Sequence, residues 1–323
     1  MPTTVLFTCA GRRVDIVTAF REAGATTFAV DIDPLAPTLR AADRCALVPR
    51  VEEKAYVPAL ASLVAEHDIG LIAPLADLDH RTLAARRAEL GALVLLPDLE
   101  VVERTVDKYA AHCFFVEHGI ASPGTWLPGE LPDELPFPVL VKPREGYGAR
   151  NLFRANDRSE LDFFLRYTPV SALVQALCGG EEFSIDVFCD LEGRCLNAVP
   201  RTMIESAGGE SIKGKTIRDP ELIEVGRHVA ETLRLRGPAT IQCFRTAPGR
   251  HELTDVNPRF GGAFPLPHAA GARFPELALA LAEGERPEPR VGDFTEGVAM
   301  TRFLSEFCFA DVREPCASPS STR

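Results

Sequence analysis

The sequence lacks the features that would place it at once among membrane, secreted or metal-binding proteins. No apolar run in its 323 residues approaches the roughly 18 that span a bilayer, and the start of the chain carries no secretory pattern. The nine cysteines form no C-x-x-C pair, and the seven histidines form no H-x-x-x-H pair. We therefore expect a reduced, cytoplasmic protein that holds no metal through cysteine or histidine.

An excess of positive charge is also absent. The chain carries 35 Lys and Arg against 46 Asp and Glu, which gives a net charge of −11. Because binding to nucleic acid or to an anionic membrane needs a basic surface, we expect neither as a partner. A local cationic pocket for an anionic small molecule stays open.

The first strand-to-helix turn lacks the G-x-G-x-x-G spacing of a dinucleotide site. The run Cys9-Ala10-Gly11-Arg12-Arg13 holds one glycine, and two arginines stand where a pyrophosphate would need room. The pattern favours a tight turn over NAD binding, and an NAD-dependent oxidoreductase would rest on this turn alone. Arg12 or Arg13 could still point into a cleft at the carboxyl ends of the strands, where ligands of such sheets bind.

The first 97 residues contain an alternation of short apolar strands with helical patterns. Such an alternation predicts βαβ units and a parallel sheet that is covered on both faces. The expected strands are 4–8, 27–30, 69–74 and 92–96, and the expected helices are 13–23, 56–67 and 79–90. We expect an α/β, Rossmann-like domain over residues 1–98.

After residue 98 the pattern changes to runs of strands with fewer helices, which predicts an α+β unit over 99–312. The expected strands are 139–142, 172–176, 183–189, 195–201, 240–245 and 252–256, and the expected helices are 107–118, 159–167, 220–235 and 275–282. We expect a loop at 122–138, a small lobe over about 119–178, and a disordered tail at 313–323.

The stretch VKPREGYGARN, residues 141–151, combines Lys142 with Gly146 and Gly148. Bare backbone amides of such loops approach phosphates closely, but here the lysine precedes the glycines, which is the reverse of a P-loop. A lysine at the end of a strand is more often a solvated edge residue. Lys142 alone therefore assigns no function.

Asp255 and Asn257 form a stronger signal, because residues i and i+2 of a strand point to the same face. Their oxygens suit a hard cation such as Mg²⁺, with Mn²⁺ as the alternative, and Mg²⁺ usually bridges to phosphates. Gln242 lies on a strand that could pair with theirs across a turn at 248–249, which would add a third oxygen ligand.

Taken in order, these residues resemble the ATP-grasp superfamily, particularly its carbamoyl phosphate synthetase and carboxylate–amine ligase branch. The resemblance runs from Lys108 and Lys142 through Glu182 to the run 255–262, and it covers nearly the whole chain. It implies a Rossmann-like pre-ATP-grasp domain followed by an α+β ATP-grasp fold, whose two lobes clasp ATP with Mg²⁺.

The resemblance also implies roles for individual residues. Lys108 and Lys142 look like the lysines that contact the α- and β-phosphates, and 144–151 looks like the mobile lid over the triphosphate. The implied nucleotide contacts in the lid, the adenine hinge and the ribose site are Arg144, Gly146, Gly148, Gln175, Ala176, Leu177, Cys178 and Glu182. The implied metal ligands are Gln242, Asp255 and Asn257, and the implied catalytic residues are Lys142, Arg201, Lys213, Lys215 and Arg259.

Three positions depart from the family pattern. The hinge often carries an acid where Gln175-Ala176 stands, the bridging metal ligand is usually Glu rather than Asp255, and Gln242 replaces an acid found in many relatives. Less negative charge around the metal implies a weaker metal affinity.

The activity that the resemblance implies is that of an ATP-dependent ligase. A small carboxylate, with amino acids among the candidates, attacks the γ-phosphate to give an acyl phosphate and ADP, and an amine then displaces phosphate. Two alternatives stay open. One is phosphorylation of bicarbonate or carbamate, although the chain offers one grasp unit and no glutaminase; the other is a non-catalytic nucleotide-binding protein.

The residues that would choose the substrates form no readable motif. The candidates are charged side chains that suit a carboxylate or an amine, namely Arg12, Arg13, Asp77, Asp79, Arg201, Arg259 and Arg302. The expected partners are thus a small carboxylate and an amine, and a homodimer is the general expectation for an oligomer.

Overall fold

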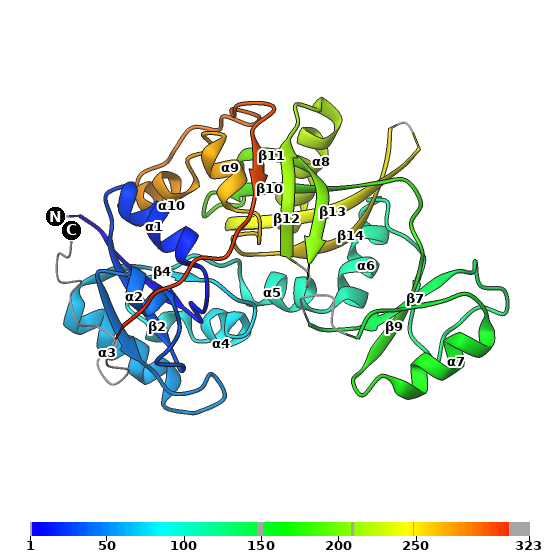
Figure 1. The fold of residues 1–323 in the computed structure, drawn as a ribbon, viewed down its shortest axis with the longest axis horizontal. Helices are drawn as coiled ribbons and strands as arrows, with labels where there is room; N and C mark the ends of the chain where they lie inside the picture. The colour runs from blue at the N-terminus through cyan, green and yellow to red at the C-terminus, as the bar shows by residue number, and fades with distance from the viewer. Residues whose placement is uncertain (1, 147–150, 208–209, 248, 310–323) are drawn as a thin grey trace.

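Three β-sheets organise the residues that the structure describes, which are 2–146, 151–207, 210–247 and 249–309 of a computed structural model. Figure 1 shows a five-stranded sheet near the N-terminus at the lower left and a six-stranded sheet at the upper centre. A four-stranded sheet lies in a lobe that projects at the right.

The N-terminal sheet is parallel and has helices on both faces. Its strands, in the order β3-β2-β1-β4-β5, are β1 (Thr4–Thr8), β2 (Thr26–Asp31), β3 (Arg44–Leu47), β4 (Ile69–Pro74) and β5 (Leu93–Val94). The helices between them are α1 (Val14–Glu22), α2 (Thr38–Ala41), α3 (Tyr56–His67) and α4 (His80–Ala85). Alternate residues of β1 point to opposite faces, so Val5 and Phe7 pack on the side of α1 while Leu6 packs on the side of α3.

This arrangement confirms the predicted Rossmann-like α/β unit. The strand order reverses between β1 and β4, and ligands of open parallel sheets bind outside the carboxyl ends of strands at such a point. The loop between β4 and α4 begins there, which makes it a wall of a candidate site.

The six-stranded sheet is antiparallel and has one apolar face and one more polar face. Its strands, in the order β14-β13-β10-β11-β12-β15, are β10 (Glu181–Cys189), β11 (Cys195–Ala207), β12 (Glu210–Thr216), β13 (Gly237–Ala247), β14 (Arg250–Asn257) and β15 (Ala299–Thr301). On β10, Ile185 and Val187 pack into a core with α8 (Pro220–Leu233). The alternate residues Glu182, Ser184 and Asp186 therefore point to the other face.

The projecting lobe is small and has a core of its own. Its strands, in the order β6-β9-β7-β8, are β6 (Thr125–Trp126), β7 (Val139–Pro143), β8 (Phe153–Ala155) and β9 (Ala172–Ala176). Helix α7 (Arg158–Tyr167) covers it through Leu161, which packs with Val139 and Val174. Two further helices, α5 (Leu99–Val106) and α6 (Lys108–Glu117), lead from the N-terminal sheet toward this lobe.

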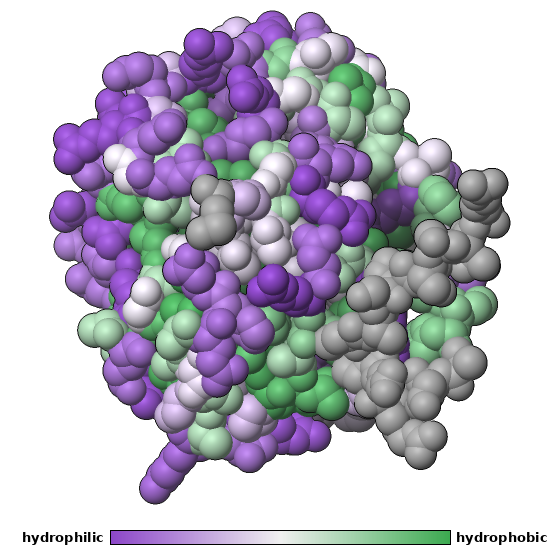
Figure 2. Space-filling view, turned by 90° about the vertical axis from the view of Figure 1, so that its left-hand side faces the viewer, coloured by the Kyte–Doolittle hydropathy of each residue, from purple (hydrophilic) through white to green (hydrophobic). Residues whose placement is uncertain are grey.

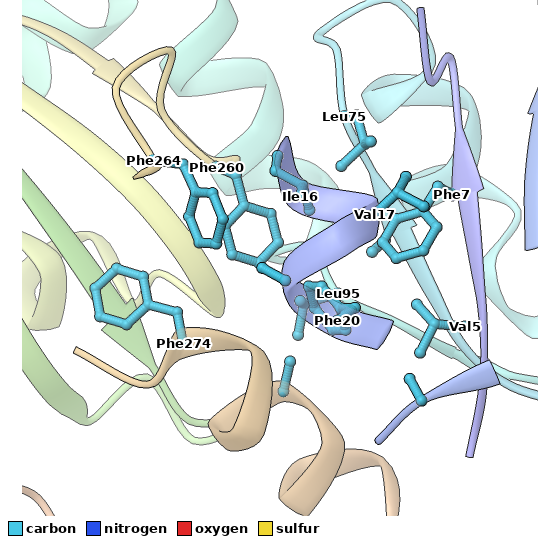
Figure 3. Close-up of a cluster of buried hydrophobic side chains, with 14 of the residues drawn as sticks. Val5, Phe7, Ile16, Val17, Phe20, Leu75, Leu95, Phe260, Phe264 and Phe274 are labelled. Carbon is cyan, nitrogen blue, oxygen red and sulfur yellow. The ribbon is translucent and has the colours of Figure 1, made fainter. Parts of the chain in front are cut away.

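The two ends of the chain share one aromatic core. The rings of Phe7 and Phe260 both meet Phe20 of α1 edge-on, with centroid distances of 5.3 Å and 5.7 Å. Phe264 and Phe274 belong to the same cluster (Figure 3). Helices α9 (Pro265–Ala269) and α10 (Phe274–Ala282) accordingly lie beside α1. The predicted boundary at residue 98 thus does not divide the core.

Most predicted elements are present, and four of them, at 4–8, 56–67, 69–74 and 172–176, have the predicted bounds. The predicted helix 79–90 is instead α4 followed by a 3-10 turn at Arg87–Glu89. The predicted loop 122–138 contains β6, which pairs with β9. Strand β12 was not predicted because its sequence is polar, and it forms a strand because it pairs with β11 and β15.

Seven cysteines among the described residues are free thiols, but Cys45 is disulfide-bonded, so the expectation of a fully reduced chain is wrong at this position. No helix among the described residues is both long and apolar enough to cross a membrane. On the side of the molecule shown in Figure 2, hydrophilic residues predominate and hydrophobic ones lie between them.

We expect Phe20→Ala to lower the free energy of unfolding by about 3–5 kcal/mol, because it removes a buried ring from the shared core. Chemical denaturation followed by circular dichroism measures this change. Leu47→Ala, at a half-exposed position of β3, is the control and should change the value by about 1 kcal/mol at most. Because the core joins both ends of the chain, the wild type should unfold in one transition, and two separate transitions would contradict a shared core.

Candidate functional site

The polar face of the six-stranded sheet gathers the three predicted metal ligands. Gln242 on β13 is the direct cross-strand partner of Asp255 on β14, as predicted from the sequence. Asn257 follows Asp255 by two residues and shares its face, because side chains alternate along a strand. These three side chains therefore present amide and carboxylate oxygens on one patch of the sheet.

This donor set fits Mg²⁺, which takes oxygen ligands and usually keeps several waters. Asp255 supplies the one carboxylate of the set, and no group of three His, Cys, Asp or Glu able to hold a metal occurs among the described residues. The three side chains together therefore carry one negative charge.

Lys142 lies at the end of β7 and reaches from the small lobe to the large sheet. Its Nζ lies 3.5 Å from the carbonyl oxygen of Thr254 on β14. Burial lowers the pKa of Lys142 to about 8, with Asp255 opposing the change and Lys108 adding to it. Lys142 therefore lies between the small lobe and the patch of Gln242, Asp255 and Asn257, which we call the metal face. At this position its positive charge suits a bound polyphosphate.

Lys108 and Arg144 are held by one hydrogen-bonded group at the start of α6. Asp107 caps the helix by accepting from the backbone N–H of Tyr109 at 3.0 Å, and Arg144 donates to both of its oxygens at 2.6–2.9 Å. Although burial opposes it, hydrogen bonding from Arg144 holds the pKa of Asp107 below its usual range. Lys108 Nζ donates to the carbonyl of Gly146 at 2.7 Å. Arg144 thus orders the start of the glycine loop.

Gly148 and Arg150 of the predicted lid lie outside the described residues. The described start of that loop is held on the N-terminal part of the chain, because Nη1 and Nη2 of Arg81 on α4 each donate to one carboxylate oxygen of Glu145 at 2.8 Å. Neither Arg81 nor Glu145 was a predicted site residue. No local sequence pattern joins two residues that are this far apart in the chain.

The predicted hinge does not present its glutamine to the cleft. The side-chain amide of Gln175 is buried and donates to the hydroxyl of Thr125 at 2.9 Å, inside the small lobe. The backbone N–H of Ala176 donates to the carbonyl of Gly124 at 2.8 Å. Leu177 is exposed, and burial raises the pKa of the Cys178 thiol to about 12, with Glu252 acting in the same direction.

The other predicted residues of the large sheet separate into two groups. Glu182 and Arg201 share the polar face, where burial raises the pKa of Glu182 and the charge of Arg201 opposes the rise. Arg201 itself is buried and donates to Asp186 at 2.7 Å. Lys213 and Lys215 are exposed on the opposite face, and Lys213 pairs with Glu205 at 2.6 Å. The structure thus does not bring these lysines to Arg201.

A cavity of about 300 Å³ opens between the N-terminal sheet and the polar face. Its walls come from four segments, which contribute Asp77 and Arg81, then Thr105, Val106 and Lys108, then Glu145–Gly146, and finally Asp255–Pro258. Arg259, the predicted phosphate contact, follows directly and is held by Asp77 at 3.0 Å. The N-terminal part of the chain therefore contributes a wall to this cavity, and is not only a scaffold.

Two of the remaining substrate candidates, Arg13 and Arg302, support the loop at 258–262. Arg13 donates to the carbonyls of Phe260 and Gly261 at 3.2 and 2.8 Å, and Arg302 donates to the carbonyl of Gly262. Asp79 is fully buried and accepts from the hydroxyl of Tyr56 at 2.7 Å. Arg12 does not line the cavity. Arg13 and Arg302 therefore hold the loop that carries Arg259.

Two family models match separate parts of the chain. Residues 5–95 match the family model "PylC-like, N-terminal domain", and residues 168–304 match "ATP-grasp in the biosynthetic pathway with Ter operon". The carbamoyl phosphate synthase large chain of Thermus thermophilus is 26% identical over 299 residues, which cover 84% of this chain. The chain spans 28% of the length of that relative.

Solved structures show the same fold. The L-amino acid ligase of Bacillus licheniformis aligns with a TM-score of 0.70 at 16% identity, covering 91% of this chain and 77% of that one. The biotin carboxylase domain of Hydrogenobacter thermophilus 2-oxoglutarate carboxylase, solved with MgADP and bicarbonate, aligns with a TM-score of 0.73 at 18% identity. That alignment covers 93% of this chain and 73% of the domain chain.

The chain has the ATP-grasp fold, with a Rossmann-like domain before its two α+β lobes.

The pKa of Lys142 leads to a prediction about ATP binding. With a pKa of about 8, Lys142 is about half protonated in the free protein at pH 8, and a bound polyphosphate would raise that pKa. We expect MgATP binding at about pH 8 to take up roughly half a proton, and ATP affinity to fall as the pH rises through this range. Calorimetry in two buffers of different ionisation enthalpy measures the uptake. Lys142→Met should abolish it, and uptake that persists in the variant would assign the proton to another group.

Proposed function

We propose that the protein is an ATP- and Mg²⁺-dependent ligase that activates a small carboxylate and joins it to an amine. The observation that carries this proposal is the convergence of Lys108, the pair Asp255 and Asn257, and the loop after β4 on one cavity. A phosphate-binding cation, metal ligands and a substrate-sized space are what phosphoryl transfer to a bound acid needs.

The reaction follows from the two halves of this site. A carboxylate oxygen of the acid attacks the γ-phosphorus, and the bond from that phosphorus to the β,γ-bridging oxygen breaks, so ADP leaves with the electron pair. The amine nitrogen then attacks the acyl carbon, and the bond to phosphate breaks. Phosphate leaves with that electron pair, and the nitrogen gives up a proton to solvent.

The residues of this chain contribute mainly charge and position. Lys108 and Lys142 suit the negative charge of the phosphates, and the space between the sheets holds the acid and keeps water from the acyl phosphate. Mg²⁺ on Gln242, Asp255 and Asn257 would neutralise charge on the transferring phosphoryl group. The backbone after Ala176 and the carboxyl of Glu182 are the proposed contacts of adenosine.

A second candidate is the phosphorylation of bicarbonate or carbamate. The similarity to a carbamoyl phosphate synthase large chain favours it. ADP release that depends on bicarbonate and on no other acid would support this reaction over the ligase.

We expect Asp255→Asn and Lys142→Ala each to lower ADP formation by about 100-fold or more, because each removes charge that faces the phosphates. A coupled assay of ADP release over amino acids and small acids, tested singly and in pairs, measures this loss. Asp162→Asn on the exposed face of α7 makes the same chemical change away from the site and should leave the rate unchanged.

Normal turnover by both variants would reject this assignment of the site. A non-catalytic nucleotide-binding protein would instead show a thermal shift with MgATP and no ADP release with any acid or amine. A thermal shift with NAD and none with MgATP would favour the oxidoreductase.

A further inference from the structure

A buried polar network lies on the same face of the large sheet as the proposed metal ligands. Oδ1 of Asp186 on β10 accepts from Oγ1 of Thr240 on β13 at 2.7 Å, and its Oδ2 accepts from Nε of Arg201 on β11 at 2.7 Å. The three residues are only 3% to 6% exposed. Asp186 is therefore enclosed by protein donors, and it does not line the cavity.

The network ends beside Asn257, which is one of the proposed metal ligands. Thr240 is the direct cross-strand partner of both Asp186 and Asn257. Directly opposed side chains share one face of a sheet, with their Cβ atoms about 4.5–5.5 Å apart. Nη2 of Arg259 also lies 3.4 Å from the side-chain oxygen of Asn257. The side chain of Asn257 thus has Thr240 as its neighbour in the sheet and Arg259 as its neighbour in the loop that follows.

The loop that follows β14 is seated directly on this network. A Cβ added to Gly261 would overlap Oγ1 of Thr240 and lie 2.6 Å from Oδ1 of Asp186, so the backbone approaches as closely as only glycine allows. Arg13 donates to the carbonyl of the same glycine at 2.8 Å. The hydrogen-bonded pair therefore sets the distance between the loop and the sheet, and with it the position of Arg259 two residues earlier.

Stability alone does not account for the network. A buried ion pair such as that of Asp186 with Arg201 often stabilises a fold no more than apolar side chains of the same volume, because both charges lose their water. Apolar side chains would, however, leave the buried hydroxyl of Thr240 without an acceptor. The carboxylate holds this hydroxyl in one position, directly beside a proposed metal ligand.

We infer that Asp186 and Thr240 are positioning residues of the proposed metal site. Asp186 fixes the side chain of Thr240, and Thr240 in turn fixes Asn257 and the seat of Gly261, while neither residue binds the metal itself. This inference rests on the proposed function, because it needs a nucleotide and a metal to bind at the metal face. It depends on no particular acid or amine as the substrate.

The test measures Mn²⁺ binding to the full-length protein in the presence of ADP, with free Mn²⁺ counted by electron paramagnetic resonance. Thr240→Val keeps the shape of the side chain but removes the hydroxyl, and we expect about 10-fold weaker Mn²⁺ binding, as is typical when a group that orients a ligand is lost. Thr240→Ser restores the hydroxyl and should keep most of the affinity. Gly261→Ala should weaken binding as Thr240→Val does, because its Cβ displaces the hydroxyl.

Two further variants separate positioning from stability. Asp186→Asn should weaken Mn²⁺ binding, and its combination with Thr240→Val should bind no more weakly than the poorer single variant, because both changes remove one hydrogen bond. Asp190, in the turn after β10, is another buried acid and pairs with Arg194 at 2.8 Å. Asp190→Asn should lower the midpoint of thermal unfolding and leave the Mn²⁺ affinity unchanged.

The outcomes distinguish this inference from the ligase function. Unchanged Mn²⁺ affinity in a folded Thr240→Val protein, or an equal loss in Thr240→Ser or in Asp190→Asn, would overturn the inference. A wild type that binds no Mn²⁺ with ADP would reject the metal site and the inference together. A wild type that binds both, with the expected losses in the variants, but releases no ADP from ATP with any acid or amine would reject the ligase and support the positioning roles.

Discussion

The edge-on contact between Phe20 and Phe260 is the interaction on which the site depends. It joins α1, near the start of the chain, to the loop that follows β14, near its end. Arg13 at the start of the same helix binds two carbonyls of that loop. Because the loop is held on the N-terminal sheet, Arg259 lies against Asp77 and the metal face lies against the loop after β4.

This shared core explains why the Rossmann-like part contributes to the site although it lacks the glycine pattern of a dinucleotide site. A parallel sheet offers a binding edge where its strand order reverses, whatever ligand occupies it. Here, that edge carries Asp77 and Arg81. Both form ion pairs with the ATP-grasp part, with Arg259 and Glu145 respectively. We see the N-terminal part as one side of a substrate cavity.

The proposed metal ligands carry little negative charge. Asp255 is the one carboxylate among the proposed metal ligands, and Lys142 lies partly buried nearby with a lowered pKa. In the absence of a polyphosphate, a buried ammonium group is costly, so this arrangement favours the protein with its nucleotide bound. The charge of Arg144, by contrast, is paired within the protein with the carboxylate of Asp107, which caps α6.

Much of the fold could be predicted from local pattern. Strands such as Thr4–Thr8 and Ile69–Pro74 are apolar because both of their faces are buried, and that composition is visible in the sequence. The pairing of Gln242 with Asp255 could also be predicted, because a short turn fixes the register of two adjacent strands. Strand β12 could not, since its polar residues form a strand only through pairing with β11 and β15.

The sequence by itself determined the class of fold and predicted the oxygen ligands and the lysines that suit phosphate, because alternation and short spacing are local properties. Only the tertiary structure decided which charges meet. Arg259 with Asp77, Arg81 with Glu145 and Gln175 with Thr125 are pairs separated by 182, 64 and 50 residues. Packing of the two ends into one core brings the first pair together, although the linear sequence leaves its two residues far apart.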